Sequence, residues 1–304
     1  MKAGKTTAIE LHGAMTALVT PFTQNGMIDD AALERLVAWQ IERGIDGLVP
    51  CGTTGEAATL SDDEKHRVVS VVTATAAGRV PVVAGCGTNN TQTTLAAARR
   101  VAEAGADALL VVTPYYNKPN RSGMIAHYEA VAGETGLPVV VYNVPGRTGQ
   151  NLGADLTLRL AQIPGVVAVK EASADLEQIA AIISGRPPGF AVLSGDDPLT
   201  LPTVALGAEG VISVVANEAP REMAGIVAAV RAGELDRARE LHYRLRPLMN
   251  ANFVETNPVP VKTAMNLLGF CEAVFRPPLG PPEDRTVQVM RDALRLAEVS
   301  EAHR

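Results

Sequence analysis

Short apolar runs recur along the chain at intervals of roughly twenty to thirty-five residues, and a polar or glycine-rich turn follows each run. Segments with helical periodicity lie between the runs. Strands that alternate with helices form a parallel sheet, and eight such repeats close it into a barrel. The eight predicted strands cover residues 15–19, 47–51, 80–85, 108–113, 138–144, 166–170, 190–194 and 210–215.

The predicted helices are amphipathic and rich in alanine, leucine and glutamate, and three of the clearest end near a glycine. These three cover residues 31–43, 91–104 and 175–183. About 90 residues follow the eighth strand, which is more than one barrel helix requires. Further helices are predicted there at residues 219–232, 234–249, 260–268 and 284–297.

We therefore predict an α/β protein, a (β/α)8 TIM barrel with a C-terminal helical appendix. The barrel is expected at residues 13–232, after a flexible N-terminal segment at residues 1–12. The appendix is expected at residues 233–304, packed on the barrel. The strands are apolar throughout rather than alternating, which is typical of a sheet covered on both faces.

Composition indicates a globular protein with an aliphatic core, since 47% of the residues are hydrophobic, 20% are charged and only 4% are aromatic. A formal net charge of -6 argues against nucleic acid as a partner. The sequence shows no apolar stretch of membrane-spanning length and no signal-like hydrophobic core, so we expect a cytoplasmic protein without a membrane partner. The three cysteines lack zinc-type spacing and are expected to be reduced thiols.

One lysine stands inside an apolar, β-branched run. Lys170 ends the predicted strand at residues 166–170, whereas the other five lysines fall in termini, loops or helix-like segments. Only Lys170 is therefore expected where desolvation removes the charge of the ammonium. A neutral amine is a nucleophile that forms a Schiff base with a carbonyl substrate. The structural alternative is a lysine that extends from a strand end to pair with a carboxylate.

Polar segments follow several predicted strands at their carboxyl ends, where barrels of this kind hold their reactive groups. Three of the five tyrosines lie in these segments, beside the strand that ends in Lys170. A phenol such as that of Tyr142 can move the protons that imine chemistry requires. Thr54, nearby backbone amides and the planar fork of Arg147 can hold a carboxylate. The set points to a 2-oxo acid as the imine partner.

Each of these motifs also has a structural explanation. Gly-Thr-Thr-Gly is a common turn, and tyrosines pack in cores and interfaces. Asp196 and Asp197 are expected to cap the following helix rather than to bind metal, because no third ligand lies nearby in sequence. The histidines at positions 12, 66, 127, 242 and 303 fall in helical or terminal segments, which argues against histidine acid–base catalysis.

Six motifs carry a family resemblance over essentially the whole chain. They are Ala-Leu-Val-Thr-Pro-Phe at residues 17–22, Gly-Thr-Thr-Gly-Glu at 52–56, Pro-Tyr-Tyr-Asn-Lys-Pro at 114–119, Tyr-Asn-Val-Pro-Gly-Arg-Thr-Gly at 142–149, Val-Lys-Glu-Ala at 169–172 and Asn-Pro-Val-Pro-Val-Lys at 257–262. With them the sequence resembles the dihydrodipicolinate synthase and N-acetylneuraminate lyase superfamily of class I pyruvate aldolases. The doubled threonine and the Pro-x-Arg-Thr-Gly turn are similar to the 4-hydroxy-tetrahydrodipicolinate synthase branch.

This resemblance implies a Schiff-base condensation of pyruvate with L-aspartate 4-semialdehyde, in lysine and diaminopimelate biosynthesis. Lys170 matches the lysine that forms the pyruvate imine, and neither a metal nor an organic cofactor is implied. Tyr142 matches the proton donor and acceptor. Thr53 and Tyr116 match the other members of a hydroxyl relay, and Tyr116 is expected to reach into the site of a neighbouring subunit. A homotetramer built as a dimer of dimers is implied.

The resemblance also assigns the substrate contacts. Thr54 and the region of Ile212 match groups that hold pyruvate, and Gly195 lies by that pocket. Arg147 matches the arginine that binds the carboxylate of aspartate semialdehyde. Two alternatives stay open. One is another pyruvate-dependent class I aldolase or dehydratase that acts on a sugar acid, and the other is a non-catalytic ligand-binding barrel.

A possible allosteric pocket is implied around Asn89 and Tyr115, because lysine-inhibited members of the family have such a pocket at a subunit interface. Three positions depart from those members. Asp62 replaces a histidine, Thr93 replaces an acidic residue, and Lys65 stands where a histidine is common. An added ammonium and a lost carboxylate both disfavour a cationic ligand. Feedback inhibition by L-lysine is therefore expected to be weak or absent.

Overall fold

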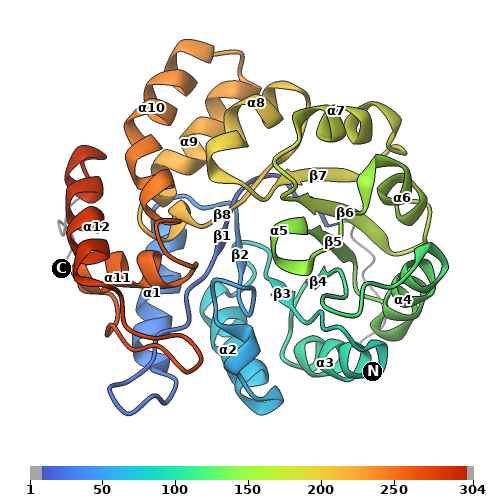
Figure 1. The fold of residues 1–304 in the computed structure, drawn as a ribbon, viewed down its shortest axis with the longest axis horizontal. Coiled ribbons are helices and arrows are strands. Elements are labelled where there is room, and N and C mark those ends of the chain that lie inside the picture. The colour runs from blue at the N-terminus through green and yellow to red at the C-terminus, as the bar shows by residue number, and fades with distance from the viewer. Residues whose placement is uncertain (1–8, 300–304) are drawn as a thin grey trace.

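Eight parallel strands form one sheet that follows the wall of a barrel, and helices surround it (Figure 1). The computed structural model describes residues 9–299. Neighbouring strands are hydrogen-bonded in the order β2-β1-β8-β7-β6-β5-β4-β3, and a parallel bridge between Leu48 and Val82 joins the two ends of that order. The predicted fold class is confirmed. Of the segments predicted at the termini, residues 1–8 and 300–304 lie outside the described part.

The strands lie within or close to the predicted apolar runs. They are β1 Gly13–Ala17, β2 Gly47–Val49, β3 Val83–Gly85, β4 Ala108–Val112, β5 Val139–Asn143, β6 Val166–Glu171, β7 Ala191–Ser194 and β8 Gly210–Ser213. β2 and β3 are shorter than predicted. At the end of β2 a backbone φ of 56° at Cys51 turns the chain out of the strand, and before β3 Pro81 has no N–H to donate.

Helices follow the strands and cover the outside of the barrel. They are α1 Asp30–Glu42, α2 Asp62–Ala76, α3 Thr91–Glu103, α4 Arg121–Thr135, α5 Pro145–Thr148, α6 Gly153–Leu160, α7 Leu176–Gly185, α8 Thr200–Ala205, α9 Pro220–Arg231, α10 Leu235–Ala251, α11 Val259–Leu267 and α12 Asp284–Leu296. Short 3-10 helices are η1 Ala57–Thr59, η2 Asp197–Leu199 and η3 Val215–Asn217. Within residues 9–299, no helix is both long and apolar enough to cross a membrane.

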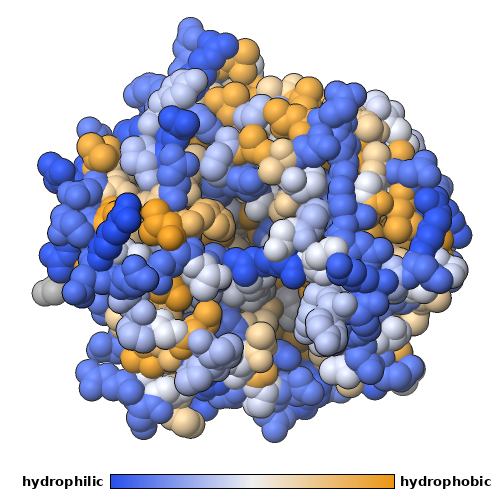
Figure 2. All heavy atoms as spheres, in the orientation of Figure 1, coloured by the Kyte–Doolittle hydropathy of each residue, from blue (hydrophilic) through white to orange (hydrophobic). Residues whose placement is uncertain are grey.

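Two apolar layers explain why the strands are hydrophobic on both faces. Inward-facing side chains such as Met15, Val49 and Leu193 fill the barrel, together with the ring of Tyr142. Outward-facing side chains pack against the surrounding helices in a larger second cluster. On the face shown in Figure 2, hydrophilic side chains cover much of the surface, with hydrophobic ones between them.

The last three helices lie on one side of the barrel, beside α9 and α1 (Figure 1). The ring of Trp39 on α1 lies 4.5 Å from the ring of Phe270, which follows α11, so the appendix packs on the helices of the barrel. The segment between α10 and α11 reaches the carboxyl ends of the strands, where it contributes Phe253 and Asn257 to a pocket. This segment joins the appendix to the functional site.

Candidate active site

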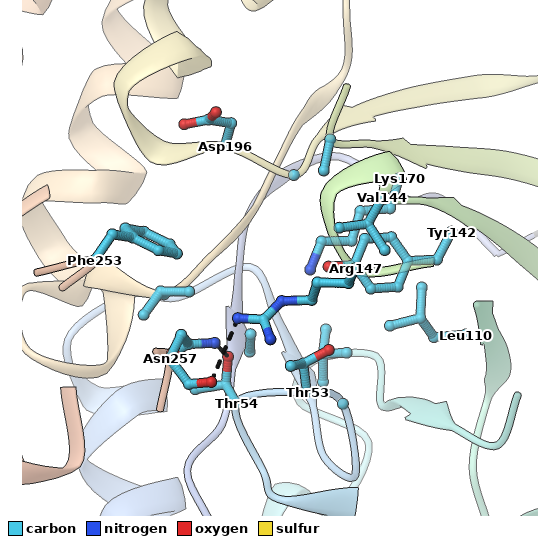
Figure 3. A pocket seen from close by; sticks show the side chains of 16 residues that line it. Thr53, Thr54, Leu110, Tyr142, Val144, Arg147, Lys170, Asp196, Phe253 and Asn257 are labelled. Carbon is cyan, nitrogen blue, oxygen red and sulfur yellow. Dashed lines mark hydrogen bonds between the residues drawn. The ribbon is translucent and has the colours of Figure 1, made fainter. Parts of the chain in front are cut away.

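A cavity of about 190 Å³ lies at the carboxyl ends of the strands, where the reactive groups were predicted (Figure 3). This volume is below the roughly 300 to 1,000 Å³ of sites for drug-sized ligands, so it suits a small acid. The lining residues are Ala17, Val49, Gly52, Thr53, Thr54, Leu110, Tyr142, Val144, Arg147, Lys170, Ala172, Gly195, Asp196, Val214, Phe253 and Asn257.

Lys170 and Tyr142 are neighbours in this cavity. Parallel pairing of β5 with β6 makes Tyr142 the partner of Lys170. Lys170 Nζ lies 4.3 Å from the centroid of the Tyr142 ring, and both side chains are buried. Within residues 9–299 the Lys170 nitrogen makes no ion pair and no hydrogen bond, so the alternative of a lysine paired with a carboxylate is wrong. The amine faces the cavity and is available to a substrate.

Glu171 holds the end of β6 on the opposite face of the sheet. Its carboxylate accepts hydrogen bonds from Asn143 Nδ2 at 2.9 Å and from the backbone N–H of Ser173 at 2.8 Å. Burial raises the pKa of Glu171, and these donors oppose that shift. Because successive side chains of a strand point to opposite faces, anchoring Glu171 outward directs Lys170 into the barrel.

Gly195 gives Lys170 its space. A Cβ at this position would lie 2.7 Å from the Cβ of Ala172 and 3.2 Å from the Cε of Lys170. The N–H of Gly195 also donates to the carbonyl of Glu171 over 2.7 Å, which holds the turn after β7 against β6. The position assigned beside the pocket by the family resemblance therefore requires a residue without a side chain.

Asn257 connects the threonine loop to Arg147, and it is a site residue to which the sequence analysis gave no role. Its Nδ2 donates to Thr54 Oγ1 over 3.0 Å, and its carbonyl accepts from Arg147 Nη2 over 3.4 Å. Figure 3 shows the Arg147 side chain extending across the pocket toward Asn257. The signal in the sequence was the Asn-Pro-Val-Pro-Val-Lys motif at residues 257–262, which carried the family resemblance without a role for Asn257.

Arg147 comes from α5, a four-residue helix that begins with Pro145 directly after β5. Proline is favoured at the first position of a helix because its fixed φ suits the helix. Its lack of an N–H costs nothing there, since an N–H at that position would have no partner within the helix. The Arg147 side chain is exposed at the mouth of the pocket. Its guanidinium fork is therefore accessible to a carboxylate that enters from solvent.

A second buried lysine lies behind the threonine loop, and the prediction that only Lys170 is desolvated is wrong. Lys262 is fully buried, with Nζ 2.6 Å from Glu56 Oε1 and 3.9 Å from the centroid of the Phe22 ring. Burial lowers the pKa of Lys262, and the Glu56 carboxylate opposes that shift. The sequence placed Lys262 at the start of a helix, but most of α11 is buried, including Val259, Pro260, Val261 and Met265.

Two residues assigned by the resemblance do not line the cavity. The ring of Tyr116 is 89% exposed, and its backbone has a φ of 75°. Ile212 lies inside the barrel among the inward-facing apolar side chains, and Val214, two residues further, lines the cavity instead. Thr53, in contrast, lies in the cavity wall as predicted. A role for Tyr116 in a neighbouring subunit stays a prediction.

A second cavity, of about 440 Å³, adjoins the first and shares Thr53, Tyr142 and Arg147 with it. Tyr115 and Lys65 line this second cavity, whereas Asn89 does not. Lys65 Nζ lies 3.5 Å from Asp62 Oδ1. Because this cavity shares residues with the first cavity and does not include Asn89, the allosteric pocket inferred around Asn89 and Tyr115 stays a prediction.

Asp196 and Asp197 do not cap the following helix, so this prediction is wrong. Asp196 precedes η2 and makes no capping bond with its side chain. Asp197 is buried, and its Oδ2 accepts from the N–H groups of Val214 and Val215 at 3.0 and 2.9 Å. Asp197 therefore fixes the turn after β8. The sequence did not reveal this contact because the two segments are 17 and 18 residues apart along the chain.

Within residues 9–299, neither cavity is lined by a histidine, and no group of side chains could bind a metal ion. His12, His66, His127 and His242 line neither cavity, and position 303 lies outside the described residues. Burial lowers the pKa of His127 to about 4, which keeps this side chain neutral at physiological pH. No cluster of three His, Cys, Asp or Glu side chains in the described residues could hold a metal ion.

The residues in the first cavity combine three chemical functions. Lys170 supplies an amine that makes no ion pair or hydrogen bond with residues 9–299, and Tyr142 supplies a phenol next to it. Thr54 and Arg147 supply hydrogen-bond donors and a positive charge at the opposite side. An amine, a phenolic proton carrier and a carboxylate clamp are the groups needed for imine chemistry on a small oxo acid.

Comparisons with known proteins give matches over most of the chain. The model of the dihydrodipicolinate synthetase family matches residues 10–297. A 4-hydroxy-tetrahydrodipicolinate synthase from Maridesulfovibrio salexigens is 52% identical over 271 residues, which cover 89% of this chain and 92% of that protein. The solved dihydrodipicolinate synthase of Thermotoga maritima is 44% identical with a TM-score of 0.93, covering 95% of this chain and 99% of that one. A dihydrodipicolinate synthase variant described as monomeric is also 44% identical with a TM-score of 0.93, covering 95% and 97% of the two chains.

Proposed function

The chain belongs to the dihydrodipicolinate synthetase family, and we propose that the cavity around Lys170 carries out the family's condensation through a covalent imine. The protein is a lyase with 4-hydroxy-tetrahydrodipicolinate synthase activity, as the names of its curated relatives indicate. These names favour this activity over a sugar-acid aldolase and over a non-catalytic barrel. One observation carries the proposal: the Lys170 amine faces the cavity beside Tyr142 without an ion pair or hydrogen bond in the described residues.

The first half of the reaction uses Lys170 as the nucleophile. Its Nζ attacks the keto carbon of pyruvate, and the carbinolamine that forms loses water to give the imine. The imine draws electrons from the neighbouring methyl group, which loses a proton to give an enamine. Gly195 supports this step because the space beside Lys170 Cε is then free for the bound pyruvate carbons.

The second half forms the new carbon–carbon bond. The enamine carbon attacks the aldehyde carbon of aspartate semialdehyde, and the aldehyde oxygen takes up a proton. The amino group of the second substrate then attacks the imine carbon, closes the ring and releases Lys170 as an amine. Pyruvate and the semialdehyde thus give 4-hydroxy-tetrahydrodipicolinate and one water. Lys170 is regenerated, and no step requires a metal or an organic cofactor.

Tyr142 carries the protons that these steps move. Its ring lies against Lys170 Nζ, so its hydroxyl group is close to where the carbinolamine and the alkoxide form. Thr53 lines the same cavity and can pass a proton onward through its hydroxyl group. A positioned acid–base group of this kind contributes about 10² to 10⁴ in rate.

Two carboxylates are bound at different places. Thr54 is buried against Asn257, and its hydroxyl group and the nearby backbone amides can hold the carboxylate of pyruvate. Arg147 stands exposed at the mouth, where it can bind the carboxylate of the second substrate after the imine has formed. Binding in this order matches a pocket that is closed at Lys170 and open at Arg147.

Tyr116 supports a shared site between subunits. Its ring is 89% exposed on a left-handed backbone, an arrangement that an L-residue adopts only at a cost. We infer that a second copy of the chain covers Tyr116 in at least a dimer, and that four copies form the working enzyme. This is tested by measuring the oligomeric state by sedimentation and the activity per chain at each step of a dilution series. The activity per chain should fall at the concentrations where the dimer dissociates.

A panel of aldehydes tests the proposed activity. The enzyme is given pyruvate with aspartate semialdehyde, or with aldehydes from sugar-acid cleavage, and pyruvate consumption is measured. We expect turnover with the semialdehyde far above that with the other aldehydes. Arg147→Ala should abolish this preference while leaving imine formation with pyruvate intact. Higher turnover with a sugar-derived aldehyde would overturn the assignment.

A further inference from the structure

Glu218 and Asn252 make a buried polar contact behind the pocket. Glu218 follows η3 after β8, and Asn252 is the C-cap residue that follows α10. Asn252 Nδ2 donates to Glu218 Oε2 over 2.9 Å. Their exposed fractions are only 0% and 1%, so bulk water solvates neither group. A carboxyl group in such a place requires a full set of hydrogen bonds within the protein.

Each group has one oxygen that finds no donor. Glu218 Oε1 and Asn252 Oδ1 are both buried and without a hydrogen-bond partner among residues 9–299. An ionised carboxylate can only accept, and so can an amide oxygen. Ionised Glu218 would therefore leave two unsatisfied acceptors in the same contact, which is an unfavourable arrangement.

A single proton on Glu218 satisfies both oxygens. A protonated Oε1 can donate to Asn252 Oδ1 while Asn252 Nδ2 donates to Oε2. A carboxylic acid and a primary amide then form a ring with two hydrogen bonds in opposite directions. We propose that Glu218 is a neutral carboxylic acid and that its two-bond pair with Asn252 fastens the end of α10 to the barrel.

The surroundings favour the neutral form. Burial raises the pKa of Glu218 well above its usual range; the hydrogen bond from Asn252 opposes this, and the nearby Asp197 carboxyl group adds to it. Asp197, at the start of η2, is the charged group of the described residues that acts on the carboxyl group of Glu218. It is acidic, so it gives no reason for Glu218 to ionise.

This pair fixes two walls of the pocket relative to each other. Phe253 and Asn257, which follow Asn252, line the pocket from the appendix. Val214, four residues before Glu218, lines it from the barrel. Glu218 and Asn252 are therefore positioning residues, which touch no substrate but hold the segment that contacts Thr54 and Arg147.

Infrared difference spectra of the parent and Glu218→Gln test the protonation state. The parent should show the C=O stretch of a protonated carboxyl group that Glu218→Gln lacks. A buried water molecule that donates to both orphan oxygens is the competing arrangement, and it leaves Glu218 ionised. No band difference at neutral pH would overturn the proposal. In Asn252→Ala the band should shift, since the proton loses its acceptor, and an unshifted band would overturn the pairing with Asn252.

The pH dependence of unfolding provides a second test with the same pair of proteins. Glu218 keeps its proton in the folded state and loses it in the unfolded state above about pH 4.3. The unfolding equilibrium constant of the parent relative to Glu218→Gln should therefore rise by up to about tenfold per pH unit. The ratio levels off once the pH passes the folded pKa. A ratio that stays flat from about pH 5 to about pH 8, at equal chain concentration, would contradict a neutral Glu218.

A kinetic test addresses the positioning role and rests on the proposed function. Asn252→Ala should raise the KM for the aldehyde about tenfold and leave borohydride trapping of pyruvate unchanged, because only the wall that carries Asn257 moves. Glu218→Gln should keep the parental KM, since a glutamine amide can make both bonds with Asn252. An unchanged KM in Asn252→Ala would overturn the positioning role. If borohydride trapped no pyruvate on the parent protein, the proposed function would be contradicted. The infrared spectra and the pH dependence of unfolding would still decide the protonation state of Glu218.

Discussion

Lys170 and Lys262 are both buried, and they differ in what lies opposite the nitrogen. Lys170 is 6% exposed with Nζ 4.3 Å from the Tyr142 ring centroid, and Lys262 is 0% exposed with Nζ 3.9 Å from that of Phe22. Lys262 Nζ also lies 2.6 Å from Glu56 Oε1. Lys170 has no carboxylate partner within residues 9–299, and its amine opens onto the cavity.

This difference shows that burial does not by itself make a lysine a nucleophile. The Glu56 carboxylate stabilises the charged form of Lys262, which then cannot attack a carbonyl. The pair instead fixes the loop that carries Thr53 and Thr54, because Glu56 directly follows this loop and is held from α11. Lys170 combines burial with an open approach, and that combination suits covalent catalysis.

Among variants that leave both lysines in place, Tyr142→Phe should have the largest effect on activity. The ring that packs against Lys170 is kept and only the hydroxyl group is lost, so kcat should fall about 10² to 10⁴-fold with little change in stability. Steady-state turnover measures kcat, thermal unfolding measures stability, and the rate of borohydride trapping with pyruvate measures imine formation. Arg147→Ala is the matched control, since it should trap pyruvate at the parental rate. Equal slowing of trapping by both variants would contradict the separate roles of these residues.

Lys262→Met should act on stability rather than on chemistry. It leaves the Glu56 carboxylate buried without its cation, which costs about 3 to 5 kcal/mol of unfolding free energy. Urea denaturation at fixed chain concentration measures the loss. Adding Glu56→Gln to Lys262→Met should recover part of it, because no unpaired carboxylate then remains in the core. A stable Lys262→Met protein that has lost imine formation would show that Lys262, too, takes part in the chemistry.

Gly195→Ala should disturb Lys170 without touching its amine. The added Cβ would lie 2.7 Å from Ala172 Cβ and 3.2 Å from Lys170 Cε, so one of them must shift. We expect a fall in kcat of about 10-fold or more and a loss of about 1 to 3 kcal/mol of stability from overpacking. Gly133→Ala on α4 is the control, since a Cβ there meets nothing within 4 Å. Parental imine formation in Gly195→Ala would show that Lys170 does not need this space.

The smallest effect is expected from added L-lysine, which should inhibit the enzyme only weakly because of a third lysine, Lys65. Lys65 lines the second cavity and lies 3.5 Å from Asp62, so the Asp62 carboxylate is already engaged by a cation of the protein. A cationic ligand would be repelled by the Lys65 ammonium. Thr93 offers no carboxylate to offset that repulsion. Activity at subsaturating pyruvate should change little with L-lysine. Strong inhibition at submillimolar L-lysine would contradict this interpretation of the cavity.

The fold could be predicted from the sequence because the strands are buried on both faces. Their apolar runs stand out between amphipathic helices, and all eight were located. The short helices α5 and α8 were missed, since four and six residues are too few to show helical periodicity. The left-handed backbone at Cys51, which ends β2, also has no sequence signal in a non-glycine residue.

The site could be predicted only where its residues lie in or next to strands. Lys170 and Tyr142 sit on neighbouring strands whose register follows from the barrel. Asn257 meets Thr54 across 203 residues of chain, and Lys262 meets Glu56 across 206, so no local pattern reveals either contact. The family resemblance placed Tyr116 and Ile212 at the site, but in a single chain neither lines the pocket.

Borohydride reduction in the presence of pyruvate, followed by peptide mapping, tests the central claim most directly. The account predicts a three-carbon adduct on the peptide that contains Lys170, and none on the peptide that contains Lys262. Lys170→Ala should lose the adduct and nearly all activity, and it should stay folded because no ion pair within residues 9–299 is broken. An unmodified Lys170 peptide under turnover conditions, or an adduct on Lys262, would contradict the account.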